Sequence, residues 1–386
     1  MRSDLDVRSA FVTLVGNPAS RRVAAFVAAV RRMWGIPVRV VSYLDLLRGR
    51  DDDPPAPGGI VRIESPGECA ATTKGILKAG IRPLEALGET PLDAADVDEL
   101  PLQRGELFPA RQWYFGFRSL LNHLEADWCS PDVRWMSTPR SIAAAFDKLA
   151  CLELWSAAGL QIPERYPDIA SYDDLRRRIP ARHARLFVKL RYGFSAMGAV
   201  ALEWRDSRLR AITTVEVVRS EGRARLFVTK KPRVLDRELD VAWLIDVLAK
   251  EDILVERWLP KARWQGRPFD LRVVTIGQRA CHVVGRANDS PFTNLNLDAR
   301  RISREALIRH LGDTWPEIES LCARAAATLP DAGMLGIDLL VRPCLRKLAL
   351  LEANAFGDFL PGLSFAGLST YEMELQQFST TEGSPA

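Results

Sequence analysis

The sequence predicts an α/β protein in which an N-terminal parallel-sheet domain precedes a two-part α+β module. Two observations carry this fold class. Residues 10–48 read as strand, helix and strand, and from residue 136 onward apolar strand-like runs alternate with helices. A chain of 386 residues, 47% of them hydrophobic, can form two or three domains and is not a disordered protein. We expect three domains and a disordered tail, at residues 1–135, 136–256, 257–378 and 379–386.

The first domain begins with a β-α-β unit. A strand at 11–15 leads into a helix that begins near Ser20 and ends near Gly35, and a second strand follows at 37–42. The same domain continues with a strand and two helices, expected at 60–63, 69–79 and 111–126.

Composition excludes several classes of protein. The formal net charge is only +4, without the concentrated basic block that is typical of a nucleic-acid binder. Asp4 and Asp6 are not typical of a secretion signal, and no apolar run reaches the roughly 18 residues of a membrane span. Six scattered cysteines and four histidines argue against a zinc site and favour a reducing compartment. We expect a cytoplasmic protein without nucleic-acid or membrane partners, and a homodimer is compatible with the sequence.

Lysine is scarce. Only nine of the 53 basic residues are lysine, which is about one lysine per 43 residues of the 386-residue chain. A lysine at a position where a particular chemistry requires one is therefore informative.

The second half alternates strands and helices. A helix is expected at 142–158, ended by Gly159, and a hairpin is expected around Ser220-Glu221-Gly222. A further helix is expected at 237–250, and the strands are expected at 185–190, 198–204, 253–256, 271–276, 337–341 and 348–353.

The last two of these strands form an acidic hairpin. If its turn is centred on Leu345, Arg342 lies opposite Leu348 and Asp338 lies opposite Glu352. Directly opposed side chains have Cβ atoms about 4.5–5.5 Å apart, so two carboxylates placed in this way repel each other.

A divalent cation would offset that repulsion. Asn354 lies on the same face as Glu352, and two carboxylates with an amide oxygen suit Mg²⁺. Two alternatives remain open at this point: an arginine neutralises the carboxylates, or the register differs by one residue.

A second pattern is typical of phosphate binding. Lys189 ends an apolar strand, and a loop containing Gly193, Ser195 and Gly198 follows it. Glycines allow successive backbone N–H groups to turn toward phosphate oxygens, and a lysine adds a point charge. The alternative is a hairpin turn with an exposed lysine. Lys148, in Asp147-Lys148-Leu149, is unremarkable on its own.

The order of these motifs resembles the ATP-grasp superfamily over residues 138–364. The resemblance is to the branch of the ribosomal-protein glutamate ligases, with similarity also to D-alanine–D-alanine ligase and glutathione synthetase. It implies a Rossmann-like domain before the ATP-grasp module. It also implies that Lys148 and Lys189 contact ATP phosphates, with the loop at 192–198 closing over them as a lid.

The remaining motifs imply further roles by the same resemblance. Glu256-Arg257-Trp258-Leu259 is similar to the hinge that holds adenine, and Asp270-Leu271-Arg272 is similar to a motif whose aspartate lies near the ribose. The resemblance makes Arg272 and Arg286 catalytic, assigns Asn294 to the nucleotide site, and makes metal ligands of Asp338, Glu352 and Asn354.

The resemblance implies an ATP-dependent ligase that forms an acyl phosphate and then an amide bond. Two Mg²⁺ ions bridged by Glu352 would assist, with Mn²⁺ as a substitute, and the carboxylate and amine would come from a small metabolite or peptide. Phe292-Thr293 and the longer segment at 354–362 depart from the family pattern where substrates bind. Two alternatives therefore stay open: a phosphotransferase, and a nucleotide-binding protein with reduced activity.

Overall fold

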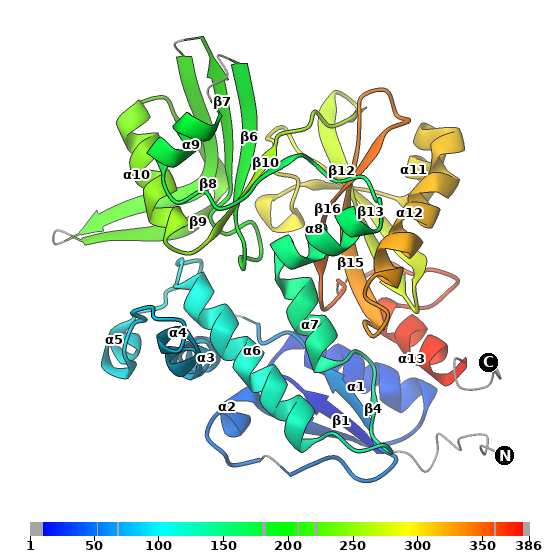
Figure 1. Ribbon diagram of the computed structural model, residues 1–386. Helices are drawn as coiled ribbons and strands as arrows, with labels where there is room; N and C mark the ends of the chain where they lie inside the picture. Colours follow the sequence, from blue (N-terminus) through cyan, green and yellow to red (C-terminus); the bar gives the residue numbers. More distant parts are fainter. Residues whose placement is uncertain are drawn as a thin grey trace.

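The structure is a computed structural model that describes residues 11–51, 53–67, 69–179, 183–206, 208–220, 223–358 and 360–380. In these parts of the chain it contains one parallel and two antiparallel sheets, each with its own helices (Figure 1). This arrangement confirms the predicted α/β class. None of the helices in the described ranges has the length and apolar character required to cross a bilayer. Asp4, Asp6 and the turn residues Glu221 and Gly222 lie outside the described residues.

The first sheet is parallel, with the strand order β2-β1-β3-β4. Its central strands are fully buried, and the Ser20 hydroxyl caps the first helix by accepting from the Arg22 N–H at 3.2 Å. The predicted β-α-β start is confirmed. The elements are β1 (Val12–Val15), α1 (Arg21–Met33), β2 (Val38–Val41), α2 (Tyr43–Leu46), β3 (Ile60–Ile63), α3 (Ala70–Ala79), α4 (Ile81–Glu85), α5 (Ala94–Glu99), α6 (Ala110–Asp127) and β4 (Arg134–Trp135).

The second sheet is antiparallel, with the strand order β5-β10-β6-β7-β8-β9. Alternate residues of its third strand are buried, as expected for a sheet with one face covered by helices. The elements are β5 (Arg165–Tyr166), α9 (Tyr172–Arg178), β6 (His183–Leu190), β7 (Val200–Arg205), β8 (Arg208–Ser220), β9 (Arg223–Leu235), α10 (Glu238–Ala249) and β10 (Ile253–Arg257).

The third sheet is also antiparallel, with the order β14-β13-β12-β15-β16 and β11 paired to β12. Every residue of β15 is buried, which accounts for its nearly continuous apolar sequence. The elements are β11 (Arg263–Trp264), β12 (Arg267–Ile276), β13 (Arg279–Ala287), η2 (Leu295–Leu297), β14 (Arg300–Ile302), α11 (Arg304–Leu311), η3 (Gly312–Thr314), α12 (Trp315–Ala327), β15 (Met334–Val341), β16 (Leu348–Asn354) and α13 (Thr370–Thr380).

The end of the chain differs from the prediction. Ser379 and Thr380 belong to α13, so a disordered tail that begins at residue 379 is wrong for these two residues. The rest of the predicted tail, at 381–386, lies outside the described residues, as does Phe359 in the segment at 354–362.

The predicted single helix at 142–158 is wrong, because two helices meet at Asp147. They are α7 (Pro139–Phe146) and α8 (Lys148–Ala157). The Asp147 backbone is extended (φ −83°, ψ 100°), and its carboxylate accepts from the N–H groups of Leu149 and Ala150 at 3.1 and 3.2 Å. This local cap competes with a continuous helix.

A distant arginine holds the break in place. Arg191 follows β6 and binds the Asp147 carboxylate through two hydrogen bonds of 2.7 and 2.6 Å. Lys148 therefore begins a new helix beside the loop that follows β6.

Helices α7 and α8 pack on the third sheet. The Trp155 indole is fully buried and donates to the Ala325 carbonyl at 3.1 Å. The domain boundaries at 135/136 and 256/257 stay predictions.

A buried ionic network joins the first sheet to α13. Arg62 bonds to Glu64 at 2.7 Å and to Glu374 at 3.0 Å. The Glu64 carboxylate also accepts from the Tyr371 hydroxyl at 2.7 Å and from Arg22 at 2.6 Å. Because these groups are paired in a buried environment, they hold the N-terminal domain against the end of the chain.

Candidate active site

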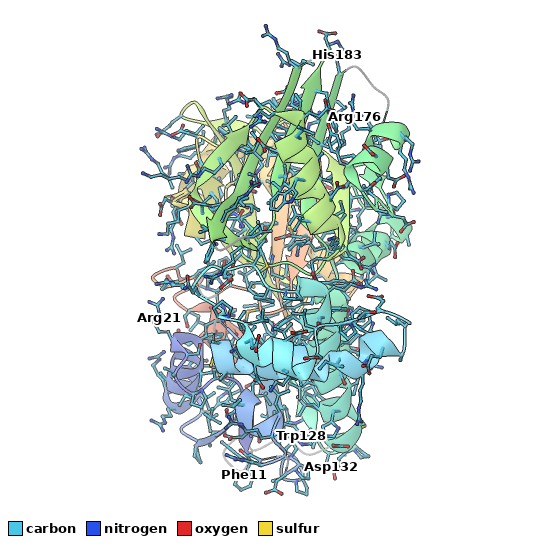
Figure 2. The ribbon with its side chains drawn as sticks, turned by 90° about the vertical axis from the view of Figure 1, so that its left-hand side faces the viewer. Phe11, Arg21, Trp128, Asp132, Arg176 and His183 are labelled. Carbon is cyan, nitrogen blue, oxygen red and sulfur yellow. The ribbon has the colours of Figure 1, made fainter. Side chains whose placement is uncertain are left out.

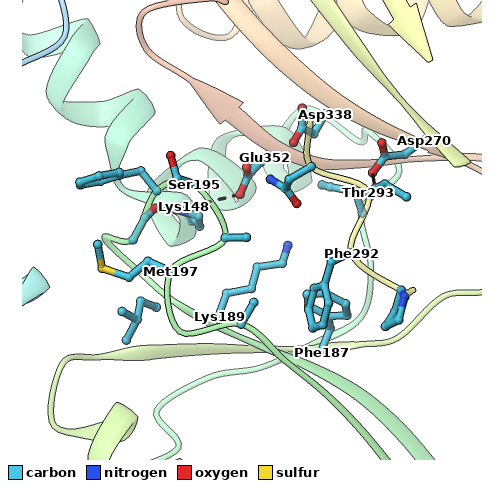
Figure 3. Close-up of a pocket in the computed structure, with 18 of the residues that line it drawn as sticks. Lys148, Phe187, Lys189, Ser195, Met197, Asp270, Phe292, Thr293, Asp338 and Glu352 are labelled. Atoms are coloured by element: carbon cyan, nitrogen blue, oxygen red, sulfur yellow. Dashed lines mark hydrogen bonds and ion pairs between the residues drawn. The ribbon is translucent and has the colours of Figure 1, made fainter. Parts of the chain in front are cut away.

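Two cavities meet where the three sheets come together. The smaller, of about 80 Å³, lies between β6, the loop after it, and the strands of the third sheet (Figure 3). The predicted site residues that line it are Lys148, Lys189, Gly193, Ser195, Asp270, Arg286, Asn294, Asp338 and Glu352.

The acidic pair is placed as predicted. Asp338 lies directly opposite Glu352 across β15 and β16. Closer to the turn, however, Val341 rather than Arg342 lies opposite Leu348, so the predicted register is wrong there by one residue. A bulge next to Asp338 adds one residue to β16 and restores the pairing at the carboxylates.

Two arginines clamp one of the carboxylates. Arg272 Nε lies 2.5 Å from Asp338 Oδ1, and Arg286 Nη2 lies 3.0 Å from Asp338 Oδ2. Burial opposes ionisation of Asp338, but the positive charges of the two guanidinium groups outweigh it and lower the pKa of the carboxyl. Neutralisation by arginine, the alternative left open above, is therefore present at Asp338.

Glu352 faces a lysine. Lys148 Nζ lies 4.0 Å from Glu352 Oε2 and donates to the Gly193 carbonyl. Burial lowers the pKa of Lys148, and the charge of Glu352 offsets part of this effect. In Figure 3 the side chains of Lys148 and Lys189 converge on the acidic pair from different strands and helices.

The donor set fits a magnesium ion. The Asn354 side-chain N–H donates to the Gly336 carbonyl, with Nδ2 at 3.0 Å from the oxygen, so the side-chain oxygen of Asn354 is free to bind a metal ion. Within the described ranges no group of three or more His, Cys, Asp or Glu residues is placed so that it could hold a metal ion by itself. Two carboxylates and an amide oxygen therefore require phosphate or water oxygens to complete an octahedral shell, which is usual for Mg²⁺.

Lys189 pairs with a buried glutamate. Its Nζ lies 3.0 Å from Glu256 Oε2, and the two side chains are 13% and 2% exposed. Burial lowers the pKa of Lys189, but the charges of Glu256 and Glu352 outweigh it and raise the pKa overall. Glu256 Oε1 is buried without a hydrogen-bond partner among the described residues.

The rest of the predicted hinge does not line either cavity. Arg257 pairs with Glu164 at 3.5 Å, and the Trp258 ring lies 4.0 Å below the guanidinium of Arg185. Glu256, Leu259 and Gly198 are also not among the residues that line the cavities. The adenine role of residues 256–259 stays a prediction.

Backbone conformation shapes the loop that follows β6. Ser195 and Ala196 both have positive φ, at 53° and 60°, and Gly198 has φ +66°. A Cβ added at Gly193 would lie 2.9 Å from the Leu190 Cβ. Successive left-handed residues are costly for L-amino acids, and such conformations are found at ligand-binding loops.

Aromatic residues anchor this loop to the N-terminal domain. The Phe194 ring lies 5.7 Å from Trp113 and 6.3 Å from Phe146. Tyr192 stacks on Tyr114 of α6, with ring centroids 4.1 Å apart. The loop is therefore held down by a surface from another domain.

The sequence did not point to Lys261, which is the third lysine that lines the smaller cavity, after Lys148 and Lys189. Its Nζ lies 3.0 Å from Asp270 Oδ2 and 2.7 Å from the Thr293 hydroxyl, and Arg286 Nε lies 2.8 Å from Asp270 Oδ1. The positive charges of Arg286 and Lys261 outweigh burial and lower the pKa of Asp270. The scarcity of lysine, applied to Lys148 and Lys189, was also the signal for Lys261.

Phe292 occupies the smaller cavity. Its side chain is 2% exposed, and its ring lies 5.4 Å from that of Phe187. The free volume of about 80 Å³ is below the roughly 300–1,000 Å³ of small-molecule sites. The smaller cavity as it stands is therefore below the usual size of a small-molecule site.

The larger cavity, of about 660 Å³, lies between the N-terminal domain and the third sheet. It shares residues Lys148, Arg286 and Glu352 with the smaller one, and Arg272 and Asn354 line it as well. The two cavities are therefore adjoining parts of one site.

The three sheets share their fold with solved structures of ATP-grasp ligases. The ATP-grasp ligase PsnB, complexed with minimal precursor, aligns with a TM-score of 0.54 and 14% identity over 97% of this chain and 99% of that one. The RiPP-associated ATP-grasp ligase of Chryseobacterium gregarium, in complex with ADP and a leader and core peptide, has a TM-score of 0.50 and 13% identity over 97% of each chain.

A third structure is the macrocyclase MdnC bound with precursor peptide MdnA, from Microcystis aeruginosa. It has a TM-score of 0.50 and 12% identity over 96% of this chain and 99% of that one. No protein-family model matches the sequence, and no curated protein matches it. At these identities the likeness establishes the fold.

Proposed function

We propose that this chain is an ATP-dependent carboxylate–amine ligase. One observation carries the proposal. Lys148 and Lys189, from different parts of the chain, meet the Asp338–Glu352 pair in one cavity of an ATP-grasp fold. Cations for phosphate oxygens beside carboxylates for a divalent cation are what phosphoryl transfer requires.

The residues have distinct proposed roles. Lys148 and Lys189 contact phosphate oxygens, and the hinge at 256–259, which lines neither cavity, is assigned to the base. Asp338, Glu352 and the side-chain oxygen of Asn354 would hold two Mg²⁺ ions, which would neutralise the charge of the phosphate oxygens. We assign Gly193, Ser195 and Gly198 to the phosphate-binding loop and Asn294 to the nucleotide site.

Binding ATP requires an exchange of partners. Arg272 and Arg286 neutralise the charge of Asp338 in the structure, and Mg²⁺ would neutralise it instead when ATP binds. Arg286 is then available for the negative charge that develops at the reacting carboxylate, and Arg272 keeps a partner in Asp358 at 3.4 Å. Phe194 and Tyr192, packed on α6, keep the loop closed so that water is excluded.

The proposed reaction has two steps. Bound ATP supplies its terminal phosphoryl group to a carboxylate oxygen of the substrate, and ADP leaves. The amine nitrogen then attacks the acyl carbon, phosphate leaves, the nitrogen loses a proton and an amide bond forms. All three of the similar structures named above are complexes with a precursor or with a leader and core peptide, which supports a peptide beside a small metabolite as the substrate. Transfer of glutamate, as in the ribosomal-protein glutamate ligases, is not part of the proposal.

The test is a screen of carboxylates and amines for release of ADP and phosphate, with mass spectrometry of the products. A product that contains both substrates supports the ligase. A phosphorylated product with no amide selects the phosphotransferase instead.

One observation favours a second candidate, a nucleotide-binding protein of reduced activity. The buried Phe292 lines the smaller cavity, and Thr293 bonds to Asp270 and Lys261. Calorimetric titration with ATP separates the candidates, because tight binding without turnover across the whole screen supports this one.

A further inference from the structure

The larger cavity has a strongly positive wall. It is bounded by α1 and the segment at 65–67 on one side, and by residues 353–358 and 360–361 on the other. Among the described residues that line it, six are basic and two are acidic: Arg21, Arg22, Lys148, Arg272, Arg286 and Arg301, against Glu352 and Asp358. A cleft with this imbalance attracts anions.

Four of the six basic residues are already engaged. Arg22 bonds to Glu64 at 2.6 Å, and Lys148 faces Glu352. Arg272 and Arg286 are committed to buried aspartates. These four therefore belong to the joint between the domains and to the inner, reactive end of the site.

Arg21 and Arg301 are different, because neither has an acidic partner among the described residues. Both are exposed, and the contact that Arg301 makes is to the Pro361 carbonyl at 3.1 Å. Arg21 belongs to the N-terminal domain and Arg301 to the third sheet, so they reach the cavity from opposite walls. Figure 2 shows Arg21 at the edge of the N-terminal domain.

Within the part of the chain that the structure describes, neither arginine has a local carboxylate to balance its charge. Arg21 and Arg22 occupy the first turn of α1, which has no acidic residue, although the helix dipole favours negative charge there. Arg301 lies directly opposite Arg286 across β13 and β14, where the nearby Asp270 and Asp338 are paired with Arg286 and not with Arg301. The next residue, Arg300, lies opposite Ala287 and points to the other face of the sheet.

We infer that the carboxylate substrate carries a second anionic group, which Arg21 and Arg301 bind at the outer end of the larger cavity. The inference rests on the proposed function for the identity of the reacting group. The reacting carboxylate lies at the inner end, beside Lys148 and Arg286. Guanidinium groups bind carboxylates and phosphates through paired hydrogen bonds, so the second group is a carboxylate or a phosphate monoester.

Aromatic side chains also line the larger cavity. The Phe146 ring lies 6.3 Å from that of Phe356, and Trp113 and Phe194 extend the same apolar surface. A ligand that spans the cavity therefore has an apolar middle section between its two anionic ends.

The test measures direct binding, without ATP, for Arg21→Gln, Arg301→Gln and the double variant. The matched controls are Arg31→Gln, an exposed position on α1, and Arg300→Gln on β14, neither of which lines the cavity. The probes are α,ω-dicarboxylic acids of four to eight carbons, the monocarboxylic acids of equal length, and phosphate monoesters of the corresponding hydroxy acids.

The expected result is selective binding of dianions. Each site variant should weaken the best dianion by about ten- to a hundredfold, as expected for a charge-assisted hydrogen bond, and leave the monoacids unchanged. The controls should stay within about twofold. Preference for the diacids or for the phosphate monoesters identifies the second group.

Other outcomes overturn the inference. It is wrong if no dianion binds more tightly than its monoacid, or if the controls lose as much affinity as the site variants. Turnover separates this failure from that of the proposed function. Selective binding without ADP release in the wide screen sinks the ligase and leaves the anion site. If ligation occurs and neither site variant changes it, the ligase proposal stands and the anion site is wrong.

Discussion

The Lys189–Glu256 pair offers a test in which stability and ligand binding separate. The pair is buried, with a 3.0 Å contact, and the other oxygen of Glu256 has no partner. Replacing Lys189 by Met removes the charge but keeps an unbranched side chain of similar length. It leaves an uncompensated carboxylate inside the second sheet.

The expected cost of Lys189→Met is about 3–5 kcal/mol of unfolding free energy, the usual cost of breaking a buried ion pair on one side. Replacing both residues by Met removes the buried charge as well, and such replacements are commonly neutral or stabilising. The double variant should therefore recover most of the lost stability.

The cost also depends on pH. Burial already raises the pKa of Glu256 above the ordinary value of 4.5, and losing Lys189 raises it further. When the pKa of a carboxyl is higher in the folded state than in the unfolded state, its protonation stabilises the folded state. This stabilisation is complete below the unfolded-state pKa and is lost as the pH rises through the folded-state pKa. The Lys189→Met variant should therefore be less destabilised at pH 4.5 than at pH 8.

The assay is equilibrium urea unfolding, followed by circular dichroism and tryptophan fluorescence at both pH values. Lys250→Met, an exposed lysine at the end of α10, makes the same substitution without a buried partner. A single variant as stable as this control, or a double variant as unstable as the single one, refutes the reasoning. ATP affinity should fall in both the single and the double variant, because each lacks the positive charge of Lys189 that is proposed to contact the phosphates.

Three further predictions follow from the site and its surroundings. Glu352→Gln should keep the fold and abolish ATP turnover, measured as ADP release and circular dichroism. Phe292→Ala should tighten ATP binding by opening the smaller cavity, at a cost of about 3–5 kcal/mol in stability, measured by calorimetry and urea unfolding. Burial raises the pKa of Glu251 to about 7, and its carboxylate accepts from the Arg111 N–H at 3.0 Å. Protonation of Glu251 therefore stabilises the folded state fully below about pH 4.5, and this stabilisation is lost as the pH rises to about 7 and above. Glu251→Gln should therefore flatten the dependence of thermal stability on pH in that window.

Specific results would contradict each of these. Full turnover by Glu352→Gln removes the metal role of that residue. Weaker ATP binding by Phe292→Ala would mean that the ring contacts the base instead of obstructing it. An unchanged pH profile for Glu251→Gln would place the titrating group elsewhere.

The sequence by itself determined the features that depend on neighbours in the chain. The acidic hairpin could be predicted because side chains alternate along strands and a short turn joins the two strands. Asp338 and Glu352 are therefore paired as expected, although a bulge was needed to correct the register. Lys148 and Lys189 could be predicted as site residues because lysine is scarce and the order of the motifs resembles that of the ATP-grasp superfamily.

Tertiary structure alone decided the features that join distant segments. Arg191 stabilises the helix break by binding Asp147, which lies 44 residues earlier in the chain. Arg272 binds Asp338, which lies 66 residues later. Phe292 fills the smaller cavity against a ring from another sheet. No local pattern encodes such pairs, because each depends on how the sheets pack and on which buried charges must find a partner.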